Sequence, residues 1–214
     1  MTGSNLRRVA RSGWVALWAV ALLGGAAPSA QAQDDTQEKI RTSIETMVTA
    51  IEEENDPMRN RMFFELRIIG SESVPALVEL MGDSRVKVRE YAMHTVSYID
   101  DERWIDPVIE LLKNDPEPST RAMACRAIAR SQDTPVLEEA GRRALPHLVA
   151  ALKGGDELVQ MDAAFALGWF GDSDSRPVLE EAARSSSELV SFFAKEALEN
   201  IAHAEKMRSR KDKS

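Results

Sequence analysis

The sequence predicts an all-α protein, an α-solenoid of about five antiparallel helix pairs wound into a right-handed superhelix. One observation is the segment Leu158–Asp172, in which apolar residues recur at the spacing that buries one face of a helix. A second is that this pattern returns several times along the chain at nearly regular intervals, as in stacked repeat units. A third is that no segment alternates apolar and polar residues as a half-buried strand does.

Each unit can be aligned on one polar residue, which we call the anchor. In Leu158–Asp172 the anchor is Gln160, and the apolar stripe follows it at Ala163, Leu167 and Phe170. The intervals between successive anchors are similar, except for a longer one between the third and the fourth. Neither helix of a pair can bury its stripe alone, so the pairs must stack on one another and share one core. The other four anchors are Arg59, Arg89, Arg121 and Ser191.

The N-terminal segment, residues 1–32, has the layout of a secretory signal peptide. Three arginines precede an uncharged apolar run, Trp14 to Leu23, and small residues close on Ala30-Gln31-Ala32. We predict that residues 1–32 are removed and that the protein is exported, either periplasmic or secreted. The run is shorter than the roughly 20 residues of a membrane span, so we expect no stable membrane insertion after cleavage. The alternative is that the segment is kept and holds the protein in the membrane.

Charge divides the remaining chain into an acidic repeat domain, residues 33–205, and a basic C-terminal tail, residues 206–214. Without the signal, 24 basic residues stand against 35 acidic ones, and the tail holds five of the basic ones. The repeat domain therefore carries a net charge near −15. A domain so acidic repels phosphate backbones, which argues against nucleic acid as a partner. The single cysteine, Cys125, permits no internal disulfide, so packing has to stabilise the fold.

The first repeat is predicted from its apolar spacing and its caps. After a short polar leader over 33–35, a helix over 36–54 buries one apolar face and covers the unit. The next helix begins at Pro57, with Asp56 as its N-cap, and ends before Gly70.

The later units share one order of elements: a helix that opens near a proline, a polar turn, and the anchored helix. Proline suits the first turn of a helix, and the polar residue of each turn stands where the second helix needs an N-cap. The longer interval, from Arg121 to Gln160, contains Thr134–Gly141, which we predict to form an extra helical turn or two. The prolines are Pro75, Pro107, Pro146 and Pro177, and the capping residues are Asp83, Asp115, Asp156 and Ser187.

Two motifs resemble those of HEAT repeats. One is the run ALGWFGD at Ala166–Asp172, and the other is an arginine followed by alanine at the third and a branched apolar residue at the seventh position, at Arg89 and Arg121. The resemblance covers Ser71–Ala202 and is greatest to the short HEAT-like repeats of phycobilin lyases. It implies an α-solenoid whose second helices line a concave face, a role in binding proteins or holding complexes together, and no catalytic residue.

No set of residues in the sequence has the spacing of a catalytic or metal site. The histidines His94, His147 and His203 include no pair with metal-binding helical spacing. Cys125 lies on an anchored helix among alanines, where a small packing residue is expected rather than a nucleophile. We therefore predict no cofactor, no metal and no enzymatic activity.

One face of the anchored helices carries residues that are typical of protein-binding sites. Positions five and nine after each anchor fall together, away from the buried stripe. Stacking would place them side by side, and aromatic residues and arginines are favoured at binding hot spots. The alternative is that the aromatic residues pack between helices and the arginines pair with nearby carboxylates. The predicted partner-binding residues are His94, Tyr98, Arg126, Arg130, Phe165 and Trp169.

These observations favour a non-catalytic, exported scaffold that binds a protein partner through the concave face of the solenoid. The alternative, suggested by the repeat subtype, is a phycobilin-lyase-like protein that handles a tetrapyrrole. The export signal opposes this alternative, because phycobilin attachment is a cytoplasmic reaction. A HEAT-like DNA glycosylase is opposed both by the acidic charge and by the signal.

Overall fold

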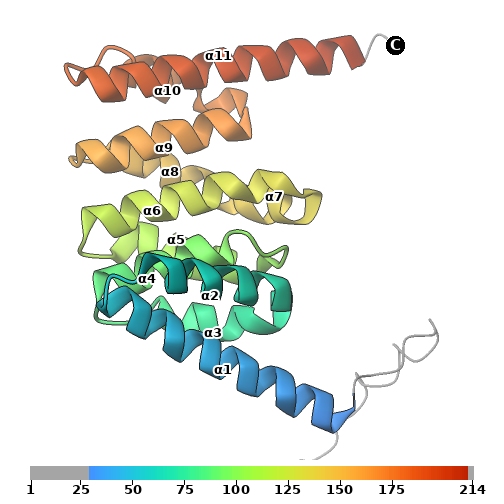
Figure 1. The fold of residues 1–214 in the computed structure, drawn as a ribbon. Coiled ribbons are helices and arrows are strands. Elements are labelled where there is room, and N and C mark those ends of the chain that lie inside the picture. Colours follow the sequence, from blue (N-terminus) through green and yellow to red (C-terminus); the bar gives the residue numbers. More distant parts are fainter. Residues whose placement is uncertain (1–28, 212–214) are drawn as a thin grey trace, which may run out of the picture.

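Antiparallel helix pairs stack along one direction to form the body of the protein (Figure 1). The structure is a computed structural model that describes residues 29–211, and this range contains eleven α-helices, five short 3-10 helices and no strand. Two layers result, because the second helices of the pairs lie side by side in front of the first helices. The predicted α-solenoid of five helix pairs is confirmed.

The helices follow the predicted order, with the predicted extra helix between the third and fourth pairs of the chain. The first helices are α1 (Ala30–Glu52), α3 (Val74–Leu80), α5 (Ile105–Asn114), α8 (Leu145–Leu152) and α10 (Arg176–Ala182). The second helices are α2 (Asp56–Ile69), α4 (Val86–Val96), α6 (Pro118–Ala129), α9 (Glu157–Phe170) and α11 (Glu188–Lys211). The extra helix is α7 (Pro135–Gly141), capped by Thr134.

The N-terminal helix differs from its predicted bounds. Helix α1 begins at Ala30, so residues 33–35 are helical and do not form a polar leader. Its start is stabilised by the hydroxyl of Ser29, which accepts a hydrogen bond from the N–H of Ala32. The expected apolar run of the signal peptide lies outside the described residues. Helix α2 is capped by Asn55, one residue before the predicted cap, and ends at Gly70 as predicted.

The predicted basic tail is in part a helix. Helix α11 continues to Lys211, so residues 206–211 extend the last repeat, and residues 212–214 lie outside the described residues. Cationic side chains favour the C-terminal end of a helix because the carbonyl groups there carry partial negative charge. Arg208 also contacts the body, since its guanidinium donates to the carbonyl of Gly171 at 3.4 Å.

The core consists of the apolar stripes that the anchors predict. In α9, Ala163, Leu167 and Phe170 are buried, and corresponding residues of α4, α6 and α11 are buried beside them. Gly168 lets α9 and α11 approach closely, because a Cβ at this position would lie 2.7 Å from the Cα of Ala197. The repeat motif therefore combines large residues that fill the core with a glycine that brings two helices into contact.

Four of the five anchor side chains hydrogen-bond to the backbone of the turn that precedes their helix, whereas Arg59 pairs with the carboxylate of Asp56. Arg89 donates through Nη1 to the carbonyls of Asp83 and Ser84, at 2.9 and 3.1 Å. These carbonyls belong to the turn between α3 and α4, where the helices supply no N–H partner for them. The same role recurs at Arg121 (to Asp115 and Pro116), Gln160 (to Leu152 and Gly154) and Ser191 (to Ala183).

The two later arginine anchors also link one unit to the next. Arg89 binds the carboxylate of Asp115 with two hydrogen bonds of 2.8 and 3.0 Å, and both side chains are buried. Arg121 pairs with Asp156 through Nη2 alone, and this carboxylate is half-exposed. These pairings correct the predicted caps, because Asp115 and Asp156 use their carboxylates mainly on arginines of the preceding unit. Among the predicted caps, Ser187 does accept the hydrogen bond from the first turn, donated by Val190.

The Arg89–Asp115 pair should contribute strongly to stability. Substituting Asp115→Ala leaves the buried guanidinium of Arg89 without its charge partner, which should cost about 3 to 5 kcal/mol of unfolding free energy. The control is Glu52→Ala, which removes the partner of Arg85 in a half-exposed pair and should cost about 1 kcal/mol or less. Chemical denaturation of both variants measures the difference, and similar losses would contradict the assigned role.

Candidate functional site

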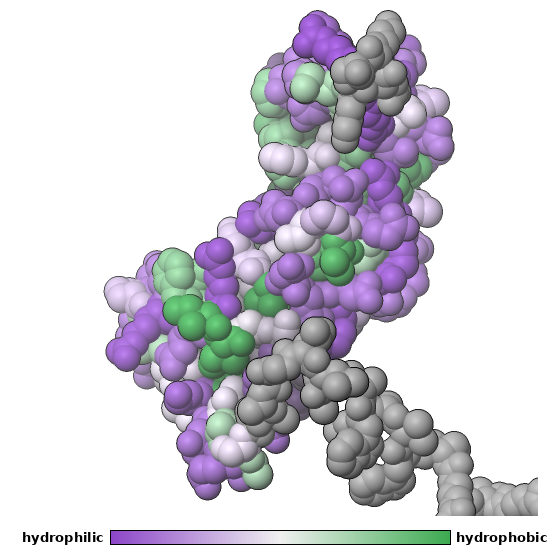
Figure 2. Space-filling model, turned by 90° about the vertical axis from the view of Figure 1, so that its right-hand side faces the viewer, coloured by the Kyte–Doolittle hydropathy of each residue, from purple (hydrophilic) through white to green (hydrophobic). Residues whose placement is uncertain are grey.

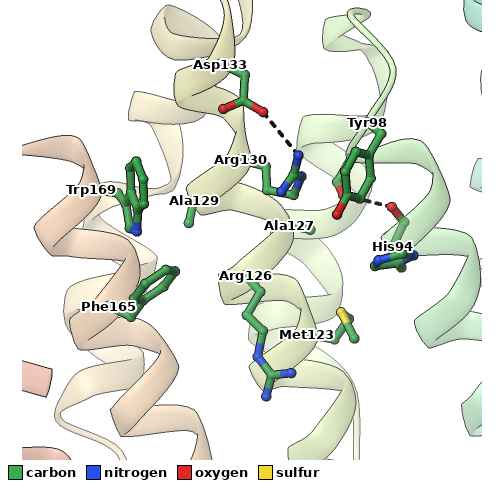
Figure 3. A pocket seen from close by; sticks show the side chains of 11 residues that line it. His94, Tyr98, Met123, Arg126, Ala127, Ala129, Arg130, Asp133, Phe165 and Trp169 are labelled. Carbon is green, nitrogen blue, oxygen red and sulfur yellow. Dashed lines mark hydrogen bonds and ion pairs between the residues drawn. The ribbon is translucent and has the colours of Figure 1, made fainter.

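The six predicted partner-binding residues line one groove on the second-helix face. The groove encloses a cavity of about 310 Å³ and is formed by α4, α6 and α9. Figure 3 shows His94 and Tyr98 on one side, Phe165 and Trp169 on the other, and Arg126 and Arg130 between them. The spacing rule therefore places these residues together, while their role in partner binding stays a prediction.

Helix packing explains why these positions meet. Each second helix packs on the next, α4 on α6 and α6 on α9, and the anchor fixes how each helix is turned about its axis. Residues five and nine positions after the anchor lie one helical turn apart, so they share one face. This face is the one opposite the core stripe, and the groove runs across the helices.

The α4 side of the groove is an aromatic cluster. The ring of His94 lies 5.2 Å from those of Phe63 and Tyr98, measured between centroids. The guanidinium of Arg130 lies 3.5 Å from the centre of the Tyr98 ring, at cation–π distance. Burial, together with the positive charges of Arg130 and Arg59, lowers the pKa of His94 below its ordinary value. His94 is therefore held neutral among aromatic neighbours.

Arg126 of α6 and Arg130, which directly follows α6, have carboxylate partners, as the alternative prediction requires. Arg126 reaches across to α9, where its Nε donates to one oxygen of Asp162 at 2.8 Å and its Nη2 lies 2.7 Å from the same oxygen. Burial raises the pKa of Asp162 even though Arg126 partly offsets this effect. Arg130 makes a longer contact of 3.3 Å with Asp133. Arg126 is thus held more firmly than Arg130.

Of the two aromatic residues of α9, Phe165 packs partly between units, as the alternative requires, whereas Trp169 does not. Trp169 is 55% exposed, and its nearest aromatic neighbour is Phe165, at 5.9 Å between ring centroids. Phe165 is partly buried and also contacts Phe193 of α11 at 6.4 Å. A large apolar side chain with this much exposure adds little to the core, so it remains free to contact a ligand.

Other candidate residues lie outside the groove. Cys125 is fully buried, and burial raises the pKa of its thiol, so it packs in the core as predicted. In the described part of the chain, no three His, Cys, Asp or Glu side chains are grouped so that they could hold a metal ion. Within residues 29–211, no helix combines the length and the apolar character needed to cross a bilayer.

Comparison with known proteins identifies the repeats. The HEAT repeat family matches residues 74–144 and 145–208, which together make up more than half of the chain. The chain belongs to the HEAT repeat family. No curated protein matches it in sequence.

Solved structures support the HEAT repeat fold. The complex of CpcE and CpcF of phycocyanin lyase from Nostoc sp. PCC7120 has a chain that is similar with a TM-score of 0.63 and 20% identity. The match covers 73% of the HEAT repeat protein and 98% of that chain. A designed armadillo repeat protein in complex with the peptide (KR)4 matches with a TM-score of 0.50 and 18% identity, covering 82% and 95% of the two chains.

The same spacing from the anchor identifies two further residues on this face that the sequence analysis did not include. Applied to the anchor Arg59, positions five and nine are Phe64 and Ile68, which are 55% and 85% exposed. They lie on α2 and extend the aromatic cluster of α4, since Phe64 contacts Phe63 at 5.1 Å. The prediction began its face one unit too late, although the anchor that locates these residues had been identified.

Protonation of His94 should destabilise the HEAT repeat domain. Its pKa in the folded state is lowered, so the unfolded chain takes up the proton first as the pH falls through about 6.5. The melting temperature should therefore drop more from about pH 7 to about pH 5 in the wild type than in His94→Gln, whose side chain does not titrate. Thermal unfolding monitored by circular dichroism measures both melting temperatures. Equal decreases in the wild type and in His94→Gln would show that His94 is not the group responsible.

Proposed function

We propose that this HEAT repeat protein is a non-catalytic scaffold that binds a protein partner through the groove of its second-helix face. One observation carries the proposal: Trp169 is more than half exposed and stands beside Arg126 and Arg130 in a single cavity. Tryptophan and arginine are the residues that most often dominate protein interfaces. No nucleic acid partner is proposed, because the domain is strongly acidic.

Two further features support a binding surface at this place. The groove combines an aromatic cluster on each side with a charged centre, as in interfaces whose apolar core is oriented by a few polar groups. The neighbouring helices are fixed by core packing and by the anchors, so the surface is held in one shape before a partner arrives. A pre-formed surface loses less conformational freedom on binding.

Partner capture should depend on Trp169. Substituting Trp169→Ala removes an exposed aromatic side chain, and it should weaken capture by about 2 kcal/mol or more while stability changes much less. The matched control is Val136→Ala, which truncates an exposed apolar residue of α7 away from the groove. Affinity capture from an envelope fraction, with mass spectrometry, measures the first effect, and thermal melting measures the second. A large loss of stability in Trp169→Ala would assign this residue to packing instead.

Arg126 is a less suitable probe of the groove. Its removal would leave the buried carboxylate of Asp162 without a charge partner, so that any loss of binding would be mixed with a loss of stability. The partner of Arg130 is the exposed Asp133, so substituting Arg130 leaves no unpaired charge buried. Arg130 is therefore the better probe.

The proposal includes export, for which the N-terminal signal layout is the argument. The structure is compatible with cleavage after Ala32, because the residues of α1 before this point are exposed and its first buried residue is Ile40. Cleavage would also leave Asp34 and Asp35 in the first turn, where negative charge suits the helix dipole.

Intact-mass measurement of secreted or periplasmic protein should show that the segment 1–32 is lost, with Gln33 at the new N-terminus. Full-length protein in the membrane fraction would instead support a retained N-terminal segment.

A second candidate function is handling of a tetrapyrrole. It is favoured by the similarity in fold to a chain of the phycocyanin lyase complex and by two arginines in an apolar groove, which could pair with propionate groups. A shift in the absorbance of a bilin on mixing with the purified protein would support this candidate. If the bilin absorbance does not change and capture of a protein partner depends on Trp169, the results would support the scaffold function.

A further inference from the structure

We infer that the groove takes an extended protein segment with an apolar side chain at each end and a carboxylate near its middle. The inference rests on the proposed function, because it specifies what the binding face recognises. It follows from the order of side chains across the second helices. An aromatic cluster on α2 and α4 comes first, two arginines on α6 follow, and a second aromatic cluster lies on α9 and α11.

The first cluster offers a broad apolar surface. Phe63 lies 5.1 Å from Phe64 and 5.2 Å from Tyr98, so these rings touch one another across α2 and α4. Ile68 stands beside them one helical turn from Phe64 and is 85% exposed, the largest exposure among the big apolar residues of the described chain. Exposed hydrophobic residues also gather in patches on the flank of the stack seen in Figure 2.

The second cluster is similar in size and lies on the last two second helices. Phe165 contacts Trp169 at 5.9 Å and Phe193 at 6.4 Å, and Phe193 contacts Phe192 at 5.4 Å. Trp169 and Phe192 are each 55% exposed. Two exposed apolar clusters on one face need two apolar groups on the ligand, because each gains free energy only when it is covered.

The arginines between the clusters retain donors for a carboxylate. Arg126 uses Nε and Nη2 on Asp162, and no hydrogen bond to its Nη1 exists among the described residues. Arg130 has a single carboxylate contact, of 3.3 Å between Nη2 and the exposed Asp133, which leaves its other terminal nitrogen, Nη1, without a hydrogen bond among the described residues. Guanidinium groups bind carboxylates through paired, charge-assisted hydrogen bonds. An acidic side chain of the ligand can therefore bind at α6.

One more arginine lies on the side of the first cluster. Arg67 is 5.5 Å from the centre of the Tyr98 ring. Arg59 lies 4.2 Å from the centre of the Tyr91 ring, but it is paired with Asp56. Arg67 therefore adds a positive charge that complements an acidic segment.

The spacing of the clusters sets the length of the ligand. Packed helices lie about 8 to 10 Å apart, and three such steps separate the middle of the first cluster, between α2 and α4, from the middle of the second, between α9 and α11, which gives about 24 to 30 Å. An extended chain advances about 3.3 Å per residue, so the two apolar side chains should be about seven to nine residues apart. The carboxylate should lie about midway between them.

The probe is a fluorescein-labelled peptide of about ten residues, a length set by the same spacing. It has leucine at each end, two central glutamates, and serine and glycine elsewhere. A matched peptide carries lysine in place of both glutamates. Binding to the full-length protein is measured by fluorescence anisotropy, and the glutamate peptide should bind about tenfold more tightly or better, as expected for a charge-assisted hydrogen bond.

Two variants and their controls assign the preference to the groove. Arg130→Ala should remove most of the preference for glutamate, whereas Arg143→Ala should not, although Arg143 also has a single carboxylate contact at 3.2 Å, with Asp106 outside the groove. Ile68→Ala should weaken binding of both peptides, and Val136→Ala, also at an exposed apolar residue, should not.

The possible outcomes separate this inference from the proposed function. A glutamate preference that disappears in Arg130→Ala supports the inference. Equal binding of both peptides, lost in Ile68→Ala, overturns the carboxylate requirement while the groove still binds protein segments. Absence of binding to either peptide overturns the inference, and partner capture by Trp169→Ala then decides the proposed function independently.

Discussion

The hydrogen bonds from the anchor side chains of the second to fifth units to carbonyls of the preceding turn help to determine how the two helices of a unit meet. Carbonyls in such a turn have no helical N–H partner, and burying them unpaired is costly. Arginine has donors to spare, so Arg89 and Arg121 also bind a carboxylate of the next unit. Gln160 and Ser191 donate hydrogen bonds to the carbonyls but, being uncharged, form no ion pair with the next unit. In the last pair, close contact of α9 and α11 at Gly168 takes over the link between units.

The rotation of each second helix about its axis also determines which side chains are exposed on the surface. Once the apolar stripe that follows the anchor is buried, the residues at positions five and nine after the anchor lie on the opposite side of the helix and point outward. Stacking then aligns these residues across successive helices. The core side chains and the groove side chains therefore alternate on the same helices. Leu167 is buried while Trp169, two residues later, is more than half exposed. The same packing that stabilises the domain therefore builds its candidate binding surface.

Charge is distributed differently on this face than on the rest of the domain. The domain is acidic, yet Arg126 of α6 and Arg130 directly after it lie at the centre of the groove. Their ion pairs differ in distance, 2.7 Å to Asp162 and 3.3 Å to Asp133. Asp162 is buried and holds Arg126 across to α9, so this pair joins two helices. Asp133 is exposed and contacts Arg130 more loosely. One arginine thus serves mainly the structure, and the other is available to a ligand, which also lets mutations separate stability from binding.

Sequence periodicity alone determined the fold class, the number of helix pairs, the buried stripe and the register of the groove, because helical spacing and the need to bury apolar residues leave few arrangements for repeated units. It did not determine how α1 begins, how far α11 extends, or which group caps each helix. Those features depend on particular partners, such as the hydroxyl of Ser29 or the carbonyl of Gly171. The exposure of Trp169 and the use of Asp115 on Arg89 rather than as a cap were also decided by the tertiary structure, because only stacking places the residues of different units side by side.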